Sequence, residues 1–268
     1  MEQALKASIK MPDYVPKPPP KESINISSIN PISLLLQIIF FGVIFLGIFY
    51  VVIITFPTIA AKVTPANLEN LLAEKITIKS DINLSREVKP LFEVLKPHLD
   101  ESLLNMKVGV INTDKENAFA FLGHSVYLTK GFLKNAQFKN EKLFVLAHEI
   151  GHVKYQDPLK GLYTNFLFEV VYGLFGNQNS FSRLALKATT LSYSRAQEKK
   201  ADLFALELLY KATGSVKGAS NFFKRMSKEH GYWEGMSAGL FSTHPVSKER
   251  IEYLKEASKA IFERKNKN

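Results

Sequence analysis

The segment His148-Glu149-Ile150-Gly151-His152 holds the residue types and the spacing of a metal-dependent site. Two histidines four residues apart lie on the same face of a helix, so both imidazoles can reach one ion. Glu149 lies at the edge of that face, where its carboxylate can touch a water on the metal rather than the metal itself. Apolar residues surround the motif: Leu143, Phe144, Leu146, Ala147, Ile150 and Val153. Because the motif would be buried among them, its polar side chains need partners, and a metal ion supplies them.

Two histidines leave an open zinc site one protein ligand short, and in hydrolases of this kind that ligand is usually a carboxylate. The chain has no cysteine, so any metal must be held by His, Asp or Glu. Glu198 and Asp202 are also four residues apart and share a helix face. Glu198 could bind the metal, while Asp202 accepts the ring N–H of a ligand histidine and so fixes its tautomer.

The elements that must position these residues are mostly helical. Asn140 is a plausible N-cap for a helix from Glu141 to about Tyr155, which Asp157-Pro158 ends. Further helices are predicted at Pro65–Lys75, Glu87–Asn105, Leu159–Phe175, Arg183–Tyr210, Val216–Lys228 and Val246–Arg264. Apolar runs separated by turn residues predict strands at Lys107–Ile111, Ala118–Leu122 and Ser125–Thr129. The predicted fold class is therefore α+β, mostly helical with a small sheet.

An apolar segment near the N-terminus predicts a membrane anchor. No charged residue occurs from Ser23 to Ala61, and a helix over the 23 residues Ile32–Ile54 would be roughly 34 Å long, against roughly 30 Å of bilayer hydrocarbon. A cleaved signal peptide has a shorter apolar region, about 7–15 residues, after a short basic start. We therefore expect a flexible proline-rich tail over residues 1–31 and one transmembrane anchor over residues 32–57. The lysines of the tail favour a cytoplasmic N-terminus and an exported main domain.

Residues 62–268 are expected to form one domain by length. The net charge of +10, from 35 Lys and Arg against 25 Asp and Glu, points to an acidic neighbour. An anionic membrane surface fits better than nucleic acid, because the basic residues are spread over many helices without a recognisable nucleic-acid fold.

The apolar segment Leu162–Phe175 has only 14 residues and is too short to span a membrane. It is either a core helix or one that partly enters the membrane.

Four motifs together resemble those of the membrane-associated zinc metallopeptidases that include HtpX and the CAAX prenyl proteases. They occur in the same order between about Lys107 and Arg250: Asn117-Ala118-Phe119-Ala120, His148–His152, Ser194–Asp202, and Ser242-Thr243-His244-Pro245 followed by Arg250. The resemblance implies a zincin-type fold and one Zn²⁺ per chain. It also implies that His148, His152 and Glu198 are the zinc ligands and that Glu149 is the general base.

The resemblance extends to the surroundings of the metal. It implies that residues Asn117, Ala118, Phe119, Ala120 and Phe121 form an edge strand that pairs with the substrate backbone, although an ordinary core strand is the alternative. His244 resembles a histidine near the zinc that either stabilises the oxyanion or blocks the water as a fourth ligand; a loop histidine before proline is the plainer interpretation. Asp202, Arg195 and Arg250 are expected to order the site rather than to react.

One departure from the family narrows the prediction. HtpX-type members carry a pair of membrane spans between the second histidine and the glutamate ligand, and no full span fits between His152 and Glu198 here. We therefore predict a single-pass, membrane-anchored zinc endopeptidase that hydrolyses proteins or peptides, with Glu149 acting on metal-bound water, and a role in protein quality control by analogy. The alternative is a non-proteolytic membrane-tethered chaperone or binding module with a structural or latched zinc site, although the intact Glu149 speaks against it. The sequence leaves the oligomeric state and the natural substrate open.

Overall fold

The structure of the protein is a computed structural model that describes residues 30–76, 82–175, 193–219, 221, 244 and 248–265. The chain divides into two compact units, Met1–Tyr50 and Val51–Asn268, and the division falls inside helix α1 (Pro31–Val63). The predicted proline-rich tail lies outside the described residues apart from Asn30 and Pro31. Predicted helix Val216–Lys228 and the beginning of predicted helix Arg183–Tyr210 lie largely outside them as well.

Helix α1 contains the predicted anchor and continues past it to Val63. Within the described part of the chain, it is the one helix long and apolar enough to cross a membrane. Its first charged residue is Lys62, and the large apolar side chains before it are mostly exposed. Pro57 lies inside the helix and is buried. Spanning itself stays a prediction.

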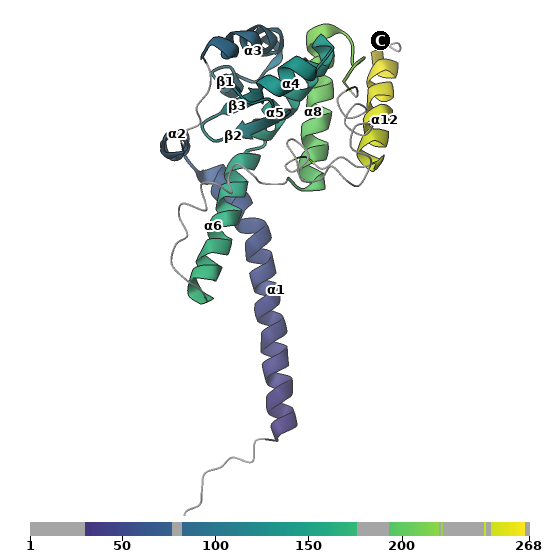
Figure 1. Cartoon of the computed structure of the whole chain (residues 1–268). Coiled ribbons are helices and arrows are strands. Elements are labelled where there is room, and N and C mark those ends of the chain that lie inside the picture. The colour runs from purple at the N-terminus through teal and green to yellow at the C-terminus, as the bar shows by residue number, and fades with distance from the viewer. Residues whose placement is uncertain are drawn as a thin grey trace, which may run out of the picture. The chain divides into compact units, whose positions relative to one another are not determined.

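A small sheet forms one layer of the second unit (Figure 1). Its strands are β1 (Lys107–Ile111), β2 (Ala118–Phe121) and β3 (Ser125–Thr129), in the order β1-β3-β2. Strand β1 is parallel to β3, whereas β2 is antiparallel to it, with Phe119 opposite Tyr127. The β2–β3 turn uses left-handed backbone at Gly123 and His124. The Gly123 N–H donates to the buried carboxylate of Glu69, 2.9 Å away, which ties the turn to α2.

The remaining described elements are helical, so the predicted mostly helical α+β fold with a small sheet is confirmed. The α-helices are α2 (Ala66–Lys75), α3 (Ile82–Leu95), α4 (Lys130–Asn135), α5 (Lys139–Lys154), α6 (Asp157–Phe175), α8 (Arg195–Thr213) and α12 (Lys248–Lys265), and two 3₁₀ turns are η1 (Lys96–His98) and η2 (Glu101–Leu103).

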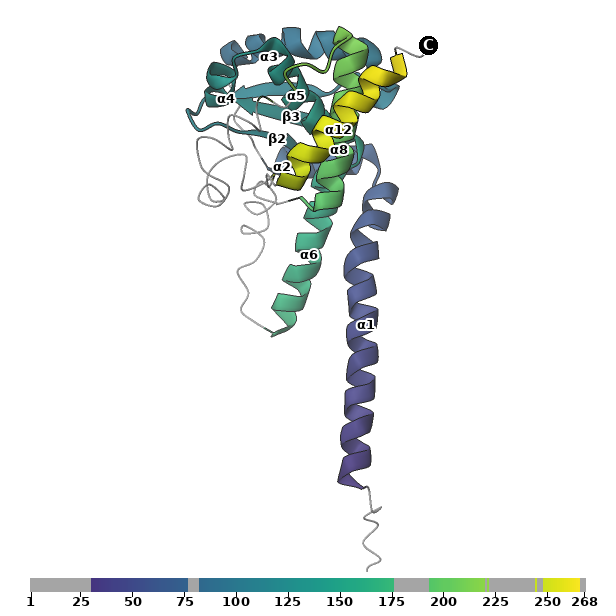
Figure 2. The same ribbon diagram turned by 90° about the vertical axis from the view of Figure 1, so that its right-hand side faces the viewer.

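Helix α5 lies at the centre of this unit, between the sheet and α8, and α12 packs on α8 (Figures 1 and 2). Every α5 residue from Leu143 to Val153 is buried, because apolar side chains occur all round this helix. They join residues of α3, the sheet and α8 in one hydrophobic core, in which Phe132, Phe144 and Leu206 are fully enclosed. The His148–His152 motif therefore lies on an enclosed helix.

Several helix boundaries differ from the sequence prediction. Helix α5 begins at Lys139 with Phe138 as its N-cap, so Asn140 is not the cap; its Nδ2 instead donates to the Lys217 carbonyl at 3.0 Å. The predicted helix Glu87–Asn105 ends at Leu95 and gives way to the two 3₁₀ turns, because the proline at position 97 disfavours helical backbone just before it. Helix α8 begins at Arg195, where Ser194 and Gln197 form a reciprocal capping box.

Candidate metal centre

Helices α5 and α8 bring three predicted ligands together, and His244 joins them. One ligand atom from each of His148, His152, Glu198 and His244 lies within 4.8 Å of the other three, and all four residues are buried. Nε2 of His148 lies 3.1 Å from Nε2 of His152 and 3.2 Å from Nδ1 of His244. The same Nδ1 of His244 is 2.8 Å from Oε1 of Glu198. Imidazole nitrogens and a carboxylate oxygen converging on one point are the donor set that zinc prefers.

A close approach of the two helices lets Glu198 reach the histidines. A Cβ atom at Gly151 would lie 3.0 Å from the Cα of Ala201 on α8 and 3.1 Å from a ring carbon of Phe204. Glu198 stands three residues before Ala201, about one helical turn away, and its Oε1 lies 3.4 Å from Nε2 of His152. Gly151 therefore has a packing role, because a side chain at this position would keep α8, and with it the candidate ligand Glu198, further from the histidines of α5.

A carboxylate lies against the outer ring nitrogen of each motif histidine. Oδ1 of Asp202 is 2.9 Å from Nδ1 of His148, as the sequence predicted for one of the ligands. Oδ2 of Asp157 is 3.0 Å from Nδ1 of His152. When Nδ1–H donates to a carboxylate, Nε2 carries the lone pair and points at the metal position. The hydrogen bond to Asp157 therefore fixes the tautomer of His152 for metal binding, while Asp202 lies within ion-pair distance of His148.

Asp157 is a histidine partner that the sequence does not predict. It is the first residue of α6, and in the sequence it indicates only the end of the preceding helix. Its other oxygen accepts from Nε2 of Gln197 at 3.0 Å and from Nζ of Lys160 at 3.1 Å. Its position five residues after His152, at a helix start, is a weak sequence signal, because only the turn between α5 and α6 folds it back onto the imidazole.

The carboxylates control the charge of the cluster. Burial alone would lower the pKa of His152, but its hydrogen bonds to Asp157 and Glu198 outweigh burial and raise the pKa to about 9. Burial would raise the pKa of Glu198, but His244 and Arg250 hold it well below its usual range. Without metal, His152 is therefore protonated at neutral pH beside an ionised Glu198. A metal ion must displace that proton when it binds.

Arg250 of α12 connects the ligand Glu198 to Asp202. Its Nη1 lies 2.6 Å from Oε2 of Glu198, while Nε and Nη2 each donate to the Asp202 carboxylate at 2.8 Å. Tyr253, one turn further on α12, also donates to Asp202. Arg250 is buried, so these charges are little screened by water. The guanidinium thus holds α12 and α8 together directly behind the metal position.

Arg195 lies outside this buried cluster, although the sequence analysis grouped it with the residues that order the site. Its side chain is 93% exposed, and its Nη1 is 3.7 Å from Oε2 of Glu249, which is also largely exposed. Arg195 is the first residue of α8, and Glu198 is one turn further on. Arg195 therefore lies in the exposed first turn of α8 and does not reach the buried cluster.

Glu149 is the buried group with fewest partners in this region. Its side chain is fully enclosed, and neither carboxylate oxygen makes a hydrogen bond to the described part of the chain. Oε1 lies 3.4 Å from Nε2 of His244. An enclosed carboxylate without donors is costly, so this one fits a site that also holds a cation and water. The donors and this carboxylate together therefore fit a catalytic zinc ion.

A second residue that the sequence did not flag is Tyr193, which precedes α8. Its ring stacks on the His152 imidazole with centroids 3.9 Å apart and planes 16° apart. Its ring centroid also lies 5.2 Å from that of His244. Tyr193 thus covers one side of the metal position. No local spacing relates it to the motif, so the sequence held no signal for this contact.

The predicted substrate strand lies at one edge of the three-stranded sheet. β2 pairs with β3 along one side, and it has no second strand partner in the described ranges. Asn117 precedes β2, and its N–H donates to Oγ1 of Thr129 at 2.8 Å. Of the strand residues, Ala118, Ala120 and Phe121 are buried, whereas Phe119 is half-buried against Tyr127. The edge that could receive a peptide therefore belongs to a strand anchored in the core.

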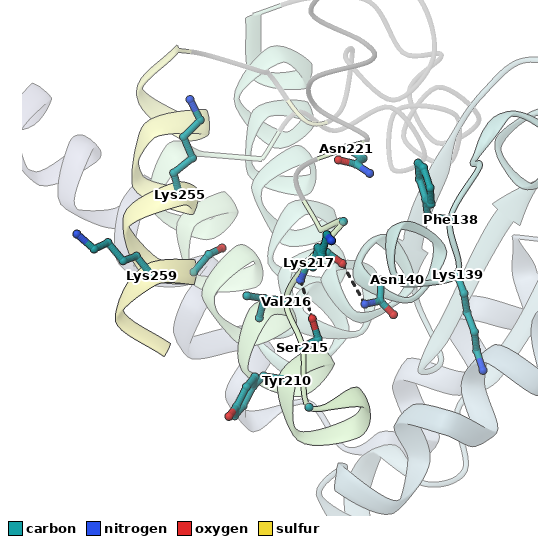
Figure 3. Close-up of a pocket in the computed structure, with 13 residues that line it drawn as sticks. Phe138, Lys139, Asn140, Tyr210, Ser215, Val216, Lys217, Asn221, Lys255 and Lys259 are labelled. Atoms are coloured by element: carbon teal, nitrogen blue, oxygen red, sulfur yellow. Dashed lines mark hydrogen bonds between the residues drawn. The ribbon is translucent and has the colours of Figure 1, made fainter. Parts of the chain in front are cut away.

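A cavity in the described part of the chain has none of the four candidate metal ligands in its lining. It measures about 1090 Å³ and lies near the C-terminal end of α8. Figure 3 shows Lys255 and Lys259 extending from α12 on one side of it, and Phe138 and Lys139 at the start of α5 on the other. A smaller cavity of about 260 Å³ is lined by Tyr193, Glu198 and Arg250 among others. Of these two cavities, the smaller one adjoins the candidate metal centre through Glu198.

A family comparison agrees with this geometry. The model of peptidase family M48 matches residues 81–258, which include both motif helices and α12 up to Ser258. The chain belongs to peptidase family M48. This is a family of zinc metallopeptidases, so the resemblance inferred from the four motifs and the zinc cofactor are both confirmed at family level.

Named relatives share the same region. Metalloprotease LoiP of Escherichia coli (strain K12) is 28% identical over 153 residues, which are 54% of this chain and 59% of LoiP. Mitochondrial metalloendopeptidase OMA1 of Schizosaccharomyces pombe is 30% identical over 160 residues, 57% of this chain and 47% of the relative. A putative beta-barrel assembly-enhancing protease of Vibrio cholerae is 28% identical over 158 residues, 53% of this chain and 32% of the relative. The match thus spans between about a third and three fifths of these relatives.

Proposed function

We propose that the protein is a membrane-anchored, zinc-dependent endopeptidase that cleaves protein or peptide substrates. The observation that carries this proposal is the enclosed carboxylate of Glu149, which has no hydrogen-bond donor among the described residues and lies 3.4 Å from His244 of the four-residue cluster. A structural metal site has no need of such a group. Membership of family M48 and relatives named metalloprotease or metalloendopeptidase support the same activity.

His148, His152 and Glu198 would hold the zinc ion, with Asp202 and Asp157 orienting the two imidazoles. When bound, zinc supplies Lewis acidity that polarises the scissile carbonyl and makes a water molecule acidic enough to attack at neutral pH. Glu149 takes the proton from the attacking water and passes it to the leaving amine. Arg250 keeps Glu198 ionised and in place throughout.

His244 has two roles open to it, and its position favours one of them at rest. Its Nδ1 faces Glu198 and His148, as a fourth ligand would, while its Nε2 faces Glu149. A fourth protein ligand would take the place of the water and leave the enzyme latched. If His244 moves aside, the same imidazole could donate to the oxyanion. We therefore propose that His244 restrains the resting site.

Substrate is proposed to bind as an extended strand along residues 117–121. Backbone hydrogen bonds to an edge strand give affinity with loose sequence preference. That property suits an enzyme that removes misfolded or unassembled proteins, and the quality-control role is proposed on this basis together with family analogy. Helix α1 is proposed as a single-pass anchor, with the N-terminus cytoplasmic and the peptidase domain exported.

The test compares casein cleavage by the purified full chain in detergent with that of Glu149→Gln and His244→Ala, with zinc content measured for each. We expect the native chain and Glu149→Gln to bind about one zinc each, with cleavage lost only in Glu149→Gln. His244→Ala should cleave faster than the native chain if His244 restrains the site. If all three proteins bind zinc and none cleaves, the closed four-ligand site favours the non-proteolytic binding module instead.

A further inference from the structure

Helix α6 exposes large apolar side chains in more than one direction. Phe166, Phe168 and Val170 are 48%, 52% and 44% exposed. At 100° per residue, Val170 points about 40° from Phe166, whereas Phe168 points about 160° away from it. From residue 161 to residue 175, Glu169 is the one charged residue. A helix on a water-exposed surface normally has a wide polar face, whereas here Asn165 and Glu169, four residues apart, form only a narrow polar strip beside these apolar side chains.

The beginning of α6 is fastened to the last turns of α1 within the second unit. Phe56 packs edge-on against the Tyr163 ring with centroids 6.1 Å apart, and the hydroxyls of Tyr163 and Thr64 are 2.6 Å apart. Ala61 of α1 shares a buried cluster with Leu159 and Leu162 of α6. Both Figure 1 and Figure 2 show α6 starting beside the end of α1. The exposed part of α6 therefore follows directly from a contact with the proposed membrane anchor.

We infer that the C-terminal half of α6 inserts into the lipid bilayer as a second membrane contact; this rests on the proposed anchoring by α1. The bilayer is the occupant that fits, because lipid tails need no polar face, and α1 already brings exposed apolar residues such as Ile59 to the same place. The 14 residues Leu162–Phe175 would be roughly 21 Å long as a helix, so they enter the bilayer without crossing it. The polar Thr164 and Asn165 come at the start of this stretch, at the level expected for the bilayer surface.

This contact would set the distance between the metal centre and the membrane. Asp157, the first residue of α6, holds His152 through a 3.0 Å hydrogen bond. Phe166 follows nine residues later, roughly 14 Å along the helix axis. An extended peptide covers about 3.3 Å per residue. The inferred substrates are therefore membrane proteins whose scissile bonds lie within about five residues of the bilayer surface.

The membrane contact can be tested without relying on activity. The chain has no cysteine, so one cysteine carrying a nitrobenzoxadiazole fluorophore labels the full chain at a single position. Phe168→Cys is compared with Phe138→Cys, whose native side chain is similarly exposed at 53% at the start of α5. In phosphatidylcholine–phosphatidylglycerol vesicles, the label at 168 should shift to the blue and be quenched by lipid-borne spin labels, and the label at 138 should not. Equal behaviour of the two labels would overturn the inference.

The substrate class is tested with Phe168→Asp, Phe168→Leu and Phe138→Asp in the same vesicles. Each is given casein and two membrane-anchored reporters, with the cleavable segment either within five or beyond twenty residues of the bilayer. Phe168→Asp should cleave casein at the native rate and lose about tenfold on the near reporter, because the site is no longer positioned over the membrane. Phe168→Leu and Phe138→Asp should keep both activities. If Phe168→Asp cleaves the reporter with the near segment at the native rate, the proposed substrate class is refuted.

The proposed function has a separate test. If Glu149→Gln still cleaves casein, the proposed peptidase function is refuted, and the fluorescence of the labelled variants still tests the membrane contact by itself.

Discussion

Replacing Gly151 by alanine should push apart the two helices that carry the proposed zinc ligands His148, His152 and Glu198. The added Cβ would lie 3.0 Å from the Cα of Ala201 and 3.3 Å from its Cβ. The Cα belongs to the backbone of α8 and cannot rotate away. Ordinary carbon contacts are about 3.5–4.0 Å, so α5 and α8 must separate locally by roughly 0.5–1 Å.

Two opposing energies decide the size of the effect. Alanine is favoured over glycine inside a helix by about 1 kcal/mol. Overpacking a tightly packed core usually costs about 1–3 kcal/mol, and a backbone contact belongs at the upper end of that range. We expect a net loss of about 1–2 kcal/mol, which corresponds to a fall in Tm of about 2–8 °C for a domain of this size. Because Glu198 lies one turn from Ala201, a shift approaching 1 Å should also reduce kcat by about ten- to a hundredfold.

The assay is a double-mutant cycle on the zinc-loaded full chain. Tm, zinc content and casein cleavage are measured for Gly151→Ala, Ala201→Gly and the pair together. Ala201→Gly removes the contact at 3.3 Å but keeps the one at 3.0 Å. The alanine at 151 should therefore cost about 0.5–1 kcal/mol less when residue 201 is glycine. A single variant Gly151→Ala that is more stable than the native chain and fully active would refute the packing argument.

Three further predictions concern the charges, the metal and the cap. Arg250→Gln should destabilise the protein by about 3–5 kcal/mol, because the buried carboxylates of Glu198 and Asp202 lose their cation. The exposed control variant Arg195→Gln should change Tm little. An equal fall in Tm for the two variants would contradict the stabilising role of Arg250. In the metal-free protein, the raised pKa of His152 contributes stability that is complete below its ordinary value of 6.5 and is lost as pH rises to about 9. The increase in Tm on adding zinc should therefore become larger from pH 6.5 to about 9, because a smaller fraction of His152 carries a proton that zinc must displace. An increase in Tm that becomes smaller as the pH rises would contradict this prediction. Ser194→Ala should cost about 1 kcal/mol by removing the cap of α8, measured by thermal unfolding, while Ser194→Asp should retain most of the stability.

Local spacing was sufficient to predict the central motif and much of the sheet. Residues four apart on a helix share a face, so the sequence alone places His148 and His152 on one face and Glu198 and Asp202 on another. The strands Lys107–Ile111 and Ser125–Thr129 occur where apolar runs separated by turn residues predicted them. These features depend on the repeat of one element and need no knowledge of its neighbours. The family resemblance then related the two helices to each other.

The tertiary structure alone decided which side chains surround the metal. Asp157 and Tyr193 reach His152 because α6 folds back against α5 and because the residue before α8 lies over the imidazole. Arg195 points into solvent although it lies between Ser194 and Glu198 in the same motif. Such contacts depend on the turn between helices and on how closely α5 and α8 pack at Gly151. The sequence by itself therefore determined which candidate ligands share a helix face, because that depends on the repeat of one helix, and packing between helices determined which side chains contact them.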